Sequence, residues 1–257
     1  EDGIREQPRS RGLGDVYKRQ GYNKAADLWG RNSEIDPENP TNIMAQGWLL
    51  HQKALMGISE SPMDDLQQAH QMAVNALEKT PDHAMLLALA STLEGMFGNF
   101  DASCARAEML ESLAREINEI VMTAETQRQC GKYKKSIETY EKAFRISPHY
   151  SSWIKQHYTY ALLQNGDLEA AKKYALEQSV HEHLSTGGNE SFHAMLAYVY
   201  QKEGDENLAK EHFEKQKNMK NSRTKKIIMN NFASVRSKVF MYDYIKVLQS
   251  LGMPVQK

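Results

Sequence analysis

Apolar residues recur three and four positions apart along most of this chain. Leu66, Ala69, Ala73, Ala76 and Leu77 follow this spacing, with polar residues between them. A period close to 3.6 residues places such side chains on one stripe of an α-helix. Windows of this kind follow one another and are separated by short polar turns. The pattern therefore predicts an all-α chain.

The turns between these helices contain glycines at regular intervals. Gly98, Gly131, Gly166 and Gly204 are spaced by 33, 35 and 38 residues. Only glycine adopts positive φ freely, so a glycine at this point allows a tight reversal between two antiparallel helices. The positions that follow each glycine share residue classes: Phe100, Tyr133 and Leu168; then Ser103, Ser136, Ala171 and Ala209; then Ala107, Tyr140, Ala175 and Phe213.

Residues 131–148 are the clearest single unit. They read Gly-Lys-Tyr-Lys-Lys-Ser-Ile-Glu-Thr-Tyr-Glu-Lys-Ala-Phe-Arg-Ile-Ser-Pro. Small residues let two helix axes approach, an aromatic fills the space between neighbouring units, and proline ends the second helix. Prolines also stand at Pro37 and Pro81. This unit resembles the second half of a tetratricopeptide (TPR) repeat, whose period is 34 residues. The resemblance implies a right-handed superhelix of antiparallel helix pairs.

The repeats divide the chain into three parts. Residues 1–20 resemble the translated reading frame of a transposase sequencing adapter, so we expect them to be an artefact and the authentic chain to begin in mid-gene near Gly21. Residues 21–222 form about five TPR-like units, of which the first is truncated to its second helix. One apolar side of Leu28 and Trp29 should therefore stay uncovered. Residues 223–257 form a helical cap, with helices expected at 224–231 and 242–251.

Two stretches narrow the resemblance. The first reads Ser61-Pro62-x-x-x-Leu66-x-x-Ala69-x-x-x-Ala73-x-x-Ala76-Leu77-x-x-x-Pro81, and the second Tyr244-Ile245-x-x-Leu248-x-x-Leu251-Gly252-Met253-Pro254. Both are similar to the C-terminal TPR region of bacterial class III adenylate/guanylate cyclase-type proteins. They also resemble the TPR half of winged-helix, ToxR-like regulators. The resemblance implies a non-catalytic scaffolding module that follows an effector domain in a signalling protein. A free-standing TPR adaptor is the other alternative.

Composition excludes several classes of function. The chain has 32 Lys and Arg against 33 Asp and Glu, so it is not a uniformly basic nucleic-acid binder. Its longest apolar run, residues 84–90, is too short to cross a bilayer. Cys104 and Cys130 show neither a CxxC motif nor zinc-ligand spacing, which favours two unpaired thiols. Two cysteines without a disulfide framework suit a reducing compartment, so the sequence favours the cytoplasm.

A partner would bind in the groove that the first helices of TPR pairs form. Aromatic side chains beside amides suit an extended peptide or an amphipathic helix. The same aromatics also serve packing between repeats, and both uses stay open here. We also expect that the open first unit could lead to self-association. The expected groove residues are Met44, Trp48, His51, Thr126, Gln129, Lys155, Tyr158, Tyr198 and Gln201.

Catalytic and metal sites are not expected. The pair His181 and His183 lacks evident third and fourth ligands, so its spacing alone does not predict a metal centre. The basic run from Lys215 to Lys226 is typical of a solvated helix end, although it could contact an acidic partner. The chain has no nucleophile elbow, HExxH motif, Walker loop or dinucleotide-binding turn. We therefore expect neither a cofactor nor an enzymatic activity in this fragment.

Overall fold

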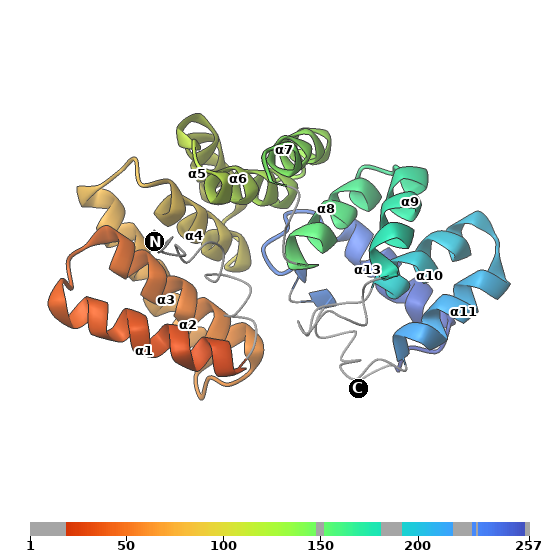
Figure 1. Ribbon diagram of the computed structural model, residues 1–257, viewed down its shortest axis with the longest axis horizontal. Helices are drawn as coiled ribbons and strands as arrows, with labels where there is room; N and C mark the ends of the chain where they lie inside the picture. The colour runs from red at the N-terminus through yellow and green to blue at the C-terminus, as the bar shows by residue number, and fades with distance from the viewer. Residues whose placement is uncertain (1–18, 148–151, 181–191, 218–227, 230, 255–257) are drawn as a thin grey trace, which may run out of the picture. The chain divides into compact units, whose positions relative to one another are not determined.

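The computed structural model of the 257-residue chain describes residues 19–147, 152–180, 192–217, 228–229 and 231–254. These residues form α-helices and short turns, with no strand among them (Figure 1). The all-α class predicted from the sequence is confirmed. The chain divides into two compact units, residues 1–76 and 77–257, with the boundary inside helix α3.

The first unit contains α1 (Arg19–Ile35), α2 (Pro40–Met56) and most of α3 (Pro62–Lys79). Asn39 caps α2, because its side-chain oxygen accepts a hydrogen bond of 2.9 Å from the Thr41 amide. Asn42 joins α2 to the end of α1 by donating to the Asn32 and Asp36 carbonyls at 3.1 and 2.8 Å. On α1, Leu28 is 51% exposed and Trp29 is half-buried.

The second unit continues with four helix pairs and a final helix. The pairs are α4 (Ala84–Met96) with α5 (Phe100–Leu113), α6 (Ile117–Gln129) with α7 (Tyr133–Ile146), α8 (Ser152–Gln164) with α9 (Leu168–Ser179), and α10 (Phe192–Glu203) with α11 (Glu206–Lys217), followed by α13 (Val239–Ser250). Successive first helices α4, α6 and α8 also contact each other, and α13 packs on α10. Helix α13 begins three residues earlier than predicted. The helix expected at 224–231 lies mostly outside the described residues.

The turn glycines have the conformation that the sequence predicted for them. Gly98, Gly131, Gly166 and Gly204 have φ angles of 83°, 81°, 83° and 85°. A Cβ atom at any of these positions would meet no other atom within 4 Å. The left-handed backbone, rather than lack of space, therefore requires glycine at each reversal.

Small residues join the two helices of a pair. The Ser136 hydroxyl donates to the Ala124 carbonyl at 2.7 Å, and the Ser91 hydroxyl donates to the Ser103 carbonyl at 2.8 Å. Ala171 and Ala209, at the same place in later units, are fully buried. A larger side chain would separate the helix axes, so the repeated small residue sets their close approach.

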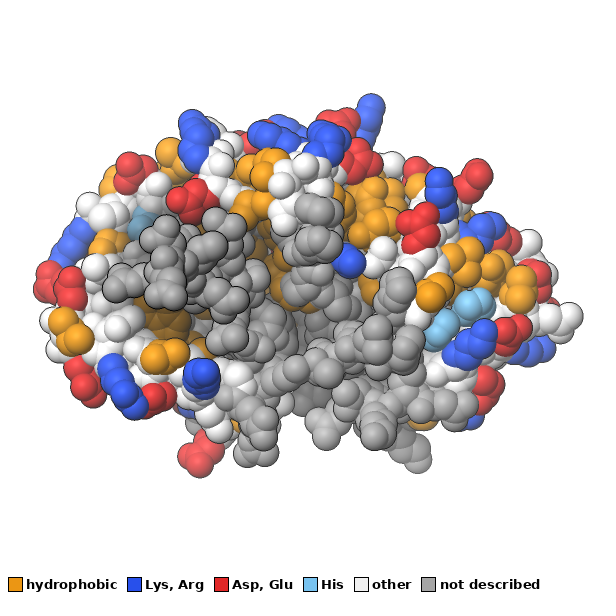
Figure 2. Space-filling view, in the orientation of Figure 1, with side chains coloured by type: hydrophobic (Ala, Val, Ile, Leu, Met, Phe, Trp, Pro, Cys, Tyr) orange, Lys and Arg blue, Asp and Glu red, His pale blue; other side chains and the backbone are white. Residues whose placement is uncertain are grey.

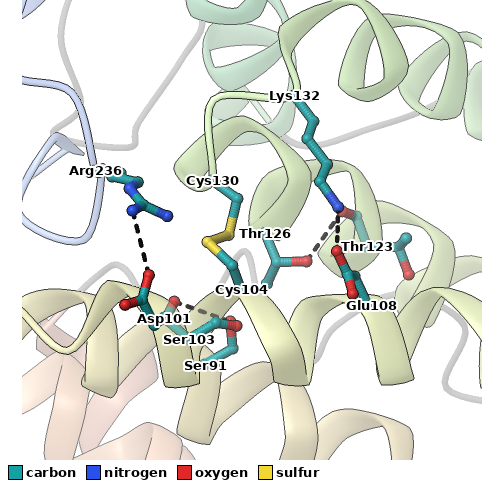
Figure 3. Close-up of a disulfide and its surroundings, with 10 residues drawn as sticks. All are labelled: Ser91, Asp101, Ser103, Cys104, Glu108, Thr123, Thr126, Cys130, Lys132 and Arg236. Carbon is teal, nitrogen blue, oxygen red and sulfur yellow. Dashed lines mark hydrogen bonds and ion pairs between the residues drawn. A yellow bond between two sulfur atoms is a disulfide. The ribbon is translucent and has the colours of Figure 1, made fainter.

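The cysteines correct one expectation from the sequence. Cys104 and Cys130 form a disulfide, with a Cα–Cα distance of 5.6 Å, and no free thiol remains in the chain. The two residues are 26 positions apart, but α5 and α6 are antiparallel neighbours joined by a short loop. Cys104 near the start of α5 therefore faces Cys130 at the end of α6 (Figure 3). Sequence spacing alone does not reveal a pairing that depends on where a helix hairpin closes.

Candidate functional site

Residues 231–238, which we call the returning segment, lie against the first helices of the second unit. Residues 232–238 are not helical and lead directly into α13. The segment contacts α4 at Gly95, α6 at Arg128 and Gln129, and α8 at Tyr160. We call the surface formed by these four residues the first-helix face.

Two hydrogen bonds hold the backbone of the returning segment. The Arg236 amide donates to the Gln129 carbonyl at 2.8 Å, and Arg128 Nη2 donates to the Asn231 carbonyl at 3.2 Å. At Gly95 the two backbones come so close that a Cβ atom there would lie 2.6 Å from the Ser234 oxygen. Gly95 therefore has a steric role, unlike the turn glycines. Main-chain contacts of this kind bind a non-helical segment with little regard to its side chains.

Two apolar side chains anchor the returning segment. Phe232 and Val235 are both fully buried. The Phe232 ring meets the Tyr160 ring edge-to-face at 4.8 Å between centroids, and the Arg128 guanidinium lies 5.3 Å from the Phe232 centroid. Full burial of such side chains contributes about 1.5–3 kcal/mol each. A cation over an aromatic face adds to this.

Arg128 is the centre of a buried polar network. Its Nε and Nη2 atoms donate to the two Glu125 oxygens at 2.9 and 2.6 Å, and its Nη1 donates to Gln164 at 2.8 Å. Glu125 also accepts from the Tyr140 hydroxyl at 3.0 Å and lies 2.9 Å from His157 Nδ1. Burial alone would raise the pKa of Glu125, but Arg128 and His157 lower that pKa below its usual range. Glu125 is therefore a buried carboxylate paired with a buried guanidinium.

The outer end of the returning segment lies near the disulfide (Figure 3). Arg236 pairs with Asp101 at 3.2 Å, and both side chains are largely exposed. Lys238 folds back and donates to the carbonyls of Phe232 and Ala233. Burial, helped by nearby Arg128, lowers the pKa of Lys238 to about 8. The segment is thus fixed by buried groups at its start and by a weak surface ion pair at Arg236.

The groove residues expected from the sequence have varied surroundings. Gln129 contacts the returning segment, whereas the Thr126 hydroxyl is buried and donates within its own helix to Thr123. Tyr158 packs between Phe144 and Tyr174, so its surroundings are those of packing between repeats. The other positions are buried (His51 and Tyr198) or half-buried (Met44, Trp48, Lys155 and Gln201).

Tyr198 belongs to the surface that faces α13. Its hydroxyl donates to Asp243 at 2.7 Å, and its ring contacts Phe240 and Tyr244. Burial, followed by the hydrogen bond to Asp243, raises the pKa of Tyr198 above its usual range. Lys202 pairs with the same carboxylate at 2.8 Å. Helix α10 therefore uses this aromatic to hold the C-terminal helix.

Trp48 and His51 form a different kind of cluster on α2 in the first unit. Their rings meet edge-to-face at 5.3 Å. Trp48 Nε1 and His51 Nδ1 are enclosed, yet neither has a hydrogen-bond partner among the described residues. Burial lowers the pKa of His51 to about 4, so this side chain is neutral at pH 7. An enclosed polar atom without a partner costs about 1–3 kcal/mol.

Arg128, Glu125 and Gly95 are functional candidates that were not predicted from the sequence. The available signal was the charged pair three residues apart on α6, where residues 120–129 are all buried. Charged side chains are rarely buried unless they are paired, but burial is not visible in the sequence. Among the described residues no group of three or more His, Cys, Asp or Glu could hold a metal ion. His181 and His183 lie outside those residues.

The basic run contributes little free charge where it is described. Lys215 pairs with Glu211 at 2.6 Å and Lys217 with Glu214 at 3.2 Å. Its later members, from Lys220 to Lys226, lie outside the described residues. Figure 2 shows acidic and basic side chains interspersed over the face in view. No described helix is both long and apolar enough to cross a membrane.

Solved structures with a similar fold come from distant proteins. The Cut9–Hcn1 hetero-tetramer of the APC/C matches at a TM-score of 0.61 and 9% identity over 91% of this chain and 47% of the other. A tetratricopeptide repeat protein from Parabacteroides merdae matches at 0.52 and 13% over 93% and 82%. The human IFIT1 dimer with PPP-AAAA matches at 0.59 and 19% over 91% and 56%. The chain spans about half the length of the first of these.

Sequence comparison gives the family directly. The tetratricopeptide repeat model matches residues 58–236, which is more than half of the chain and includes most of the returning segment. No curated protein matches the sequence. The repeat spacing, the positive-φ glycines and the paired helices agree with this match. The chain belongs to the tetratricopeptide repeat family.

Proposed function

We propose that this chain is a non-catalytic protein-interaction module that holds a non-helical segment of another protein on its first-helix face. Tetratricopeptide repeats imply a protein-interaction role in general. The observation that carries the specific proposal is the way Arg128 and Gln129 hold the backbone of a non-helical segment. A surface that holds one non-helical segment by its main-chain atoms has the chemistry to hold another.

A display experiment tests this function without knowledge of the partner. The full chain would be used to select from a library of genomic fragments of the source organism displayed on phage. We expect fragments with a shared short motif that bind again as purified peptides. Failure to select any fragment that rebinds would contradict the interaction role.

The sequence also supports a proposal for the kinds of partner that this chain binds. We propose a protein or peptide partner and self-association, with no nucleic acid bound by this fragment; the near-neutral net charge of −1 supports the last point. Trp48→Ala and Tyr198→Ala should each weaken partner binding. Because Tyr198 also supports α13, Tyr198→Phe is the control that keeps the ring and removes only the hydroxyl.

For the cellular context we propose the C-terminal regulatory part of a longer bacterial signalling protein. The resemblance of the 61–81 and 244–254 stretches to the TPR regions of cyclase-type proteins supports this proposal. A TPR half of a winged-helix regulator and a free-standing adaptor are the alternatives. Reading the DNA upstream of the Gly21 codon separates them. An in-frame cyclase domain supports the first, a winged-helix domain the second, and a start codon one helix upstream the third.

The disulfide between Cys104 and Cys130 indicates the kind of cellular compartment in which the protein is found. The sequence favoured the cytoplasm because two unpaired cysteines suit a reducing environment. Paired cysteines persist in oxidising compartments and are rare in the cytosol. We therefore propose an oxidising compartment instead. The test is alkylation of acid-quenched cells followed by mass spectrometry: unmodified Cys104 and Cys130 support the proposal, and full alkylation before reduction contradicts it.

A further inference from the structure

We propose that the returning segment is an internal ligand that occupies the binding face, and that the partner enters by replacing it with a segment of the same side-chain pattern. This inference rests on the proposed function and specifies it. The pattern is an aromatic residue, any residue, a small residue, an aliphatic residue and a basic residue. In this chain these are Phe232, Ala233, Ser234, Val235 and Arg236.

Each position of the pattern follows from one contact. The aromatic position is set by the space between Tyr160 and Arg128 that Phe232 fills. The small position is set by Gly95, because an ideal Cβ there would lie 3.2 Å from Ser234 Cβ and a bulky residue at 234 would crowd the helix. Ser234 is also 6% exposed, which leaves little room for a longer side chain.

The remaining two positions set apolar and charge preferences. Val235 is fully buried, so the fourth position favours an aliphatic side chain. Arg236 lies against Asp101 at 3.2 Å, so the fifth position favours a cation. The backbone bonds from Arg128 and to Gln129 are available to any sequence. The expected partner is therefore an unstructured basic segment with two apolar anchors three residues apart.

Two features distinguish the returning segment from the repeats that it covers. Its residues 232–238 form a turn and a short irregular stretch with few backbone hydrogen bonds, such as the one of 3.2 Å from the Val235 amide to the Phe232 carbonyl, whereas the surfaces beneath are helices. At its outer end the Arg236 side chain is held only by the exposed ion pair with Asp101, which contributes about 0–1 kcal/mol, while the Arg236 amide donates to the Gln129 carbonyl at 2.8 Å. A competing peptide can therefore first take the place of Arg236 at Asp101 and then that of Val235 and Phe232.

The test uses a labelled peptide with the sequence of residues 231–238 and fluorescence anisotropy on the full chain. Phe232→Ser with Val235→Ser loosens the internal ligand without changing the face beneath it. We expect this double variant to bind the peptide about tenfold more tightly than the wild type, because occupancy of a site by an internal competitor reduces apparent affinity by the free fraction. A peptide with its Phe and Val replaced by Ser is the control and should not bind.

Two further substitutions in the loosened variant locate the peptide. Gly95→Ala should abolish binding, since the added Cβ takes the space of the peptide backbone, whereas Gly30→Ala on α1, with nothing within 4 Å, should not. Asp101→Lys should reverse the charge preference, so that a peptide with Glu in place of Arg binds better. Binding that ignores both Gly95→Ala and Asp101→Lys would overturn the proposal.

The proposal stays falsifiable if the double variant does not fold. Arg236→Glu changes only an exposed side chain and should tighten peptide binding by about threefold through loss of the ion pair. In the wild type, excess peptide should also speed hydrogen exchange of the Arg236 amide. A folded loosened variant, or a folded Arg236→Glu variant, that binds no better than the wild type would make the segment a structural cap only.

The two levels of the proposal can fail separately. If display yields rebinding fragments whose affinity is insensitive to Gly95→Ala, the interaction role stands and the internal-ligand inference fails. If display yields none while the loosened variant binds the 231–238 peptide, the internal ligand stands and the role in binding other proteins fails.

Discussion

Helices α2 and α6 both carry enclosed polar side chains, but these side chains differ in the hydrogen-bond partners that they find. On α6, Arg128 uses Nε, Nη1 and Nη2 in hydrogen bonds and has a carboxylate beside it. On α2, Trp48 Nε1 and His51 Nδ1 have no partner among the described residues. A buried charge without partners costs far more than a buried neutral donor. Arg128 and Glu125 are therefore paired with each other, whereas neutral enclosed atoms on both helices, Gln127 Nε2 and Gln129 Oε1 on α6 as well as the two ring atoms on α2, have no partner among the described residues.

The comparison also separates what each surface can do. The α6 surface already holds a segment of its own chain, through the hydrogen bond from Arg128 to the Asn231 carbonyl and the contact of Arg128 with the Phe232 ring. The α2 surface has a half-buried indole beside a neutral imidazole. Enclosed polar atoms that lack partners mark a place where a ligand group could add a hydrogen bond.

Removing the charge from the α6 surface should have the largest effect. Arg128→Met leaves Glu125 buried without its cation and should lower the free energy of unfolding by about 3–5 kcal/mol. Urea unfolding followed by circular dichroism measures this. The control is Lys132→Met, which breaks a surface pair with Glu108 and should cost about 1 kcal/mol or less. Equal losses would show that the Arg128 network contributes no more than a surface pair.

The disulfide supports the α6 side of the comparison only. Replacing Cys104 and Cys130 by Ser releases a loop closed over 26 residues, which should lower stability by about 3 kcal/mol. Thermal unfolding of the wild type with and without reductant gives the same comparison without a substitution. If reductant does not change the unfolding temperature of the wild type, the disulfide is not formed in solution.

Adding one methyl group tests the close approach at the returning segment. Gly95→Ala places a Cβ within 2.6 Å of the Ser234 oxygen and should cost about 1–3 kcal/mol through overpacking. Gly30→Ala meets no atom within 4 Å and replaces a helical glycine, so it should stabilise α1 by about 0.5–1 kcal/mol. Opposite signs in urea unfolding would support the steric role of Gly95.

The neutral surface on α2 should respond to pH. Because burial lowers the pKa of His51 to about 4, the unfolded chain binds a proton between pH 6.5 and 4 that the folded chain does not. Stability is therefore full above pH 6.5 and falls as the pH falls through this window. His51→Leu should reduce the slope of unfolding free energy by about 1 kcal/mol per pH unit near pH 5. The two proteins should have equal slopes from pH 7 to 8.

The smallest effect is expected where a polar atom already lacks a partner. Trp48→Phe removes an unpaired donor and should change stability by less than about 1 kcal/mol, because lost ring area and relieved desolvation oppose each other. Tyr140→Phe is the matched change on the α6 side. It removes a buried hydrogen bond to Glu125 and should cost about 1.5–3 kcal/mol. Similar costs would remove the distinction between the two surfaces.

Periodic features of the fold could be predicted from sequence because each depends on a few local residues. The four turn glycines are an example, because the positive φ angle that each adopts depends only on that residue being glycine. The small residues at 103, 136, 171 and 209 follow the repeat, and each packs against the helix just before it. Local features that repeat at a period close to 34 residues are therefore sufficient to predict the family from the sequence.

The candidate site could be predicted only in part. Gln129 and Tyr198, two of the expected groove residues, contact residues of the C-terminal part of the chain, Arg236 and Asp243. Tyr158 has the same register but packs between repeats, because rotation of a helix by part of a turn changes which neighbour its side chain meets. An aromatic serves both surfaces equally well, so its residue type does not decide between them.

By itself the sequence determined the helical class, the repeat period and the places where the chain reverses. Tertiary structure alone decided that Cys104 meets Cys130, that Arg128 is buried against Glu125, and that residues 231–238 lie on the first-helix face. These contacts join positions that are far apart in the chain or depend on burial. These contacts stabilise the protein only after the helices have packed together, so no local sequence pattern predicts them.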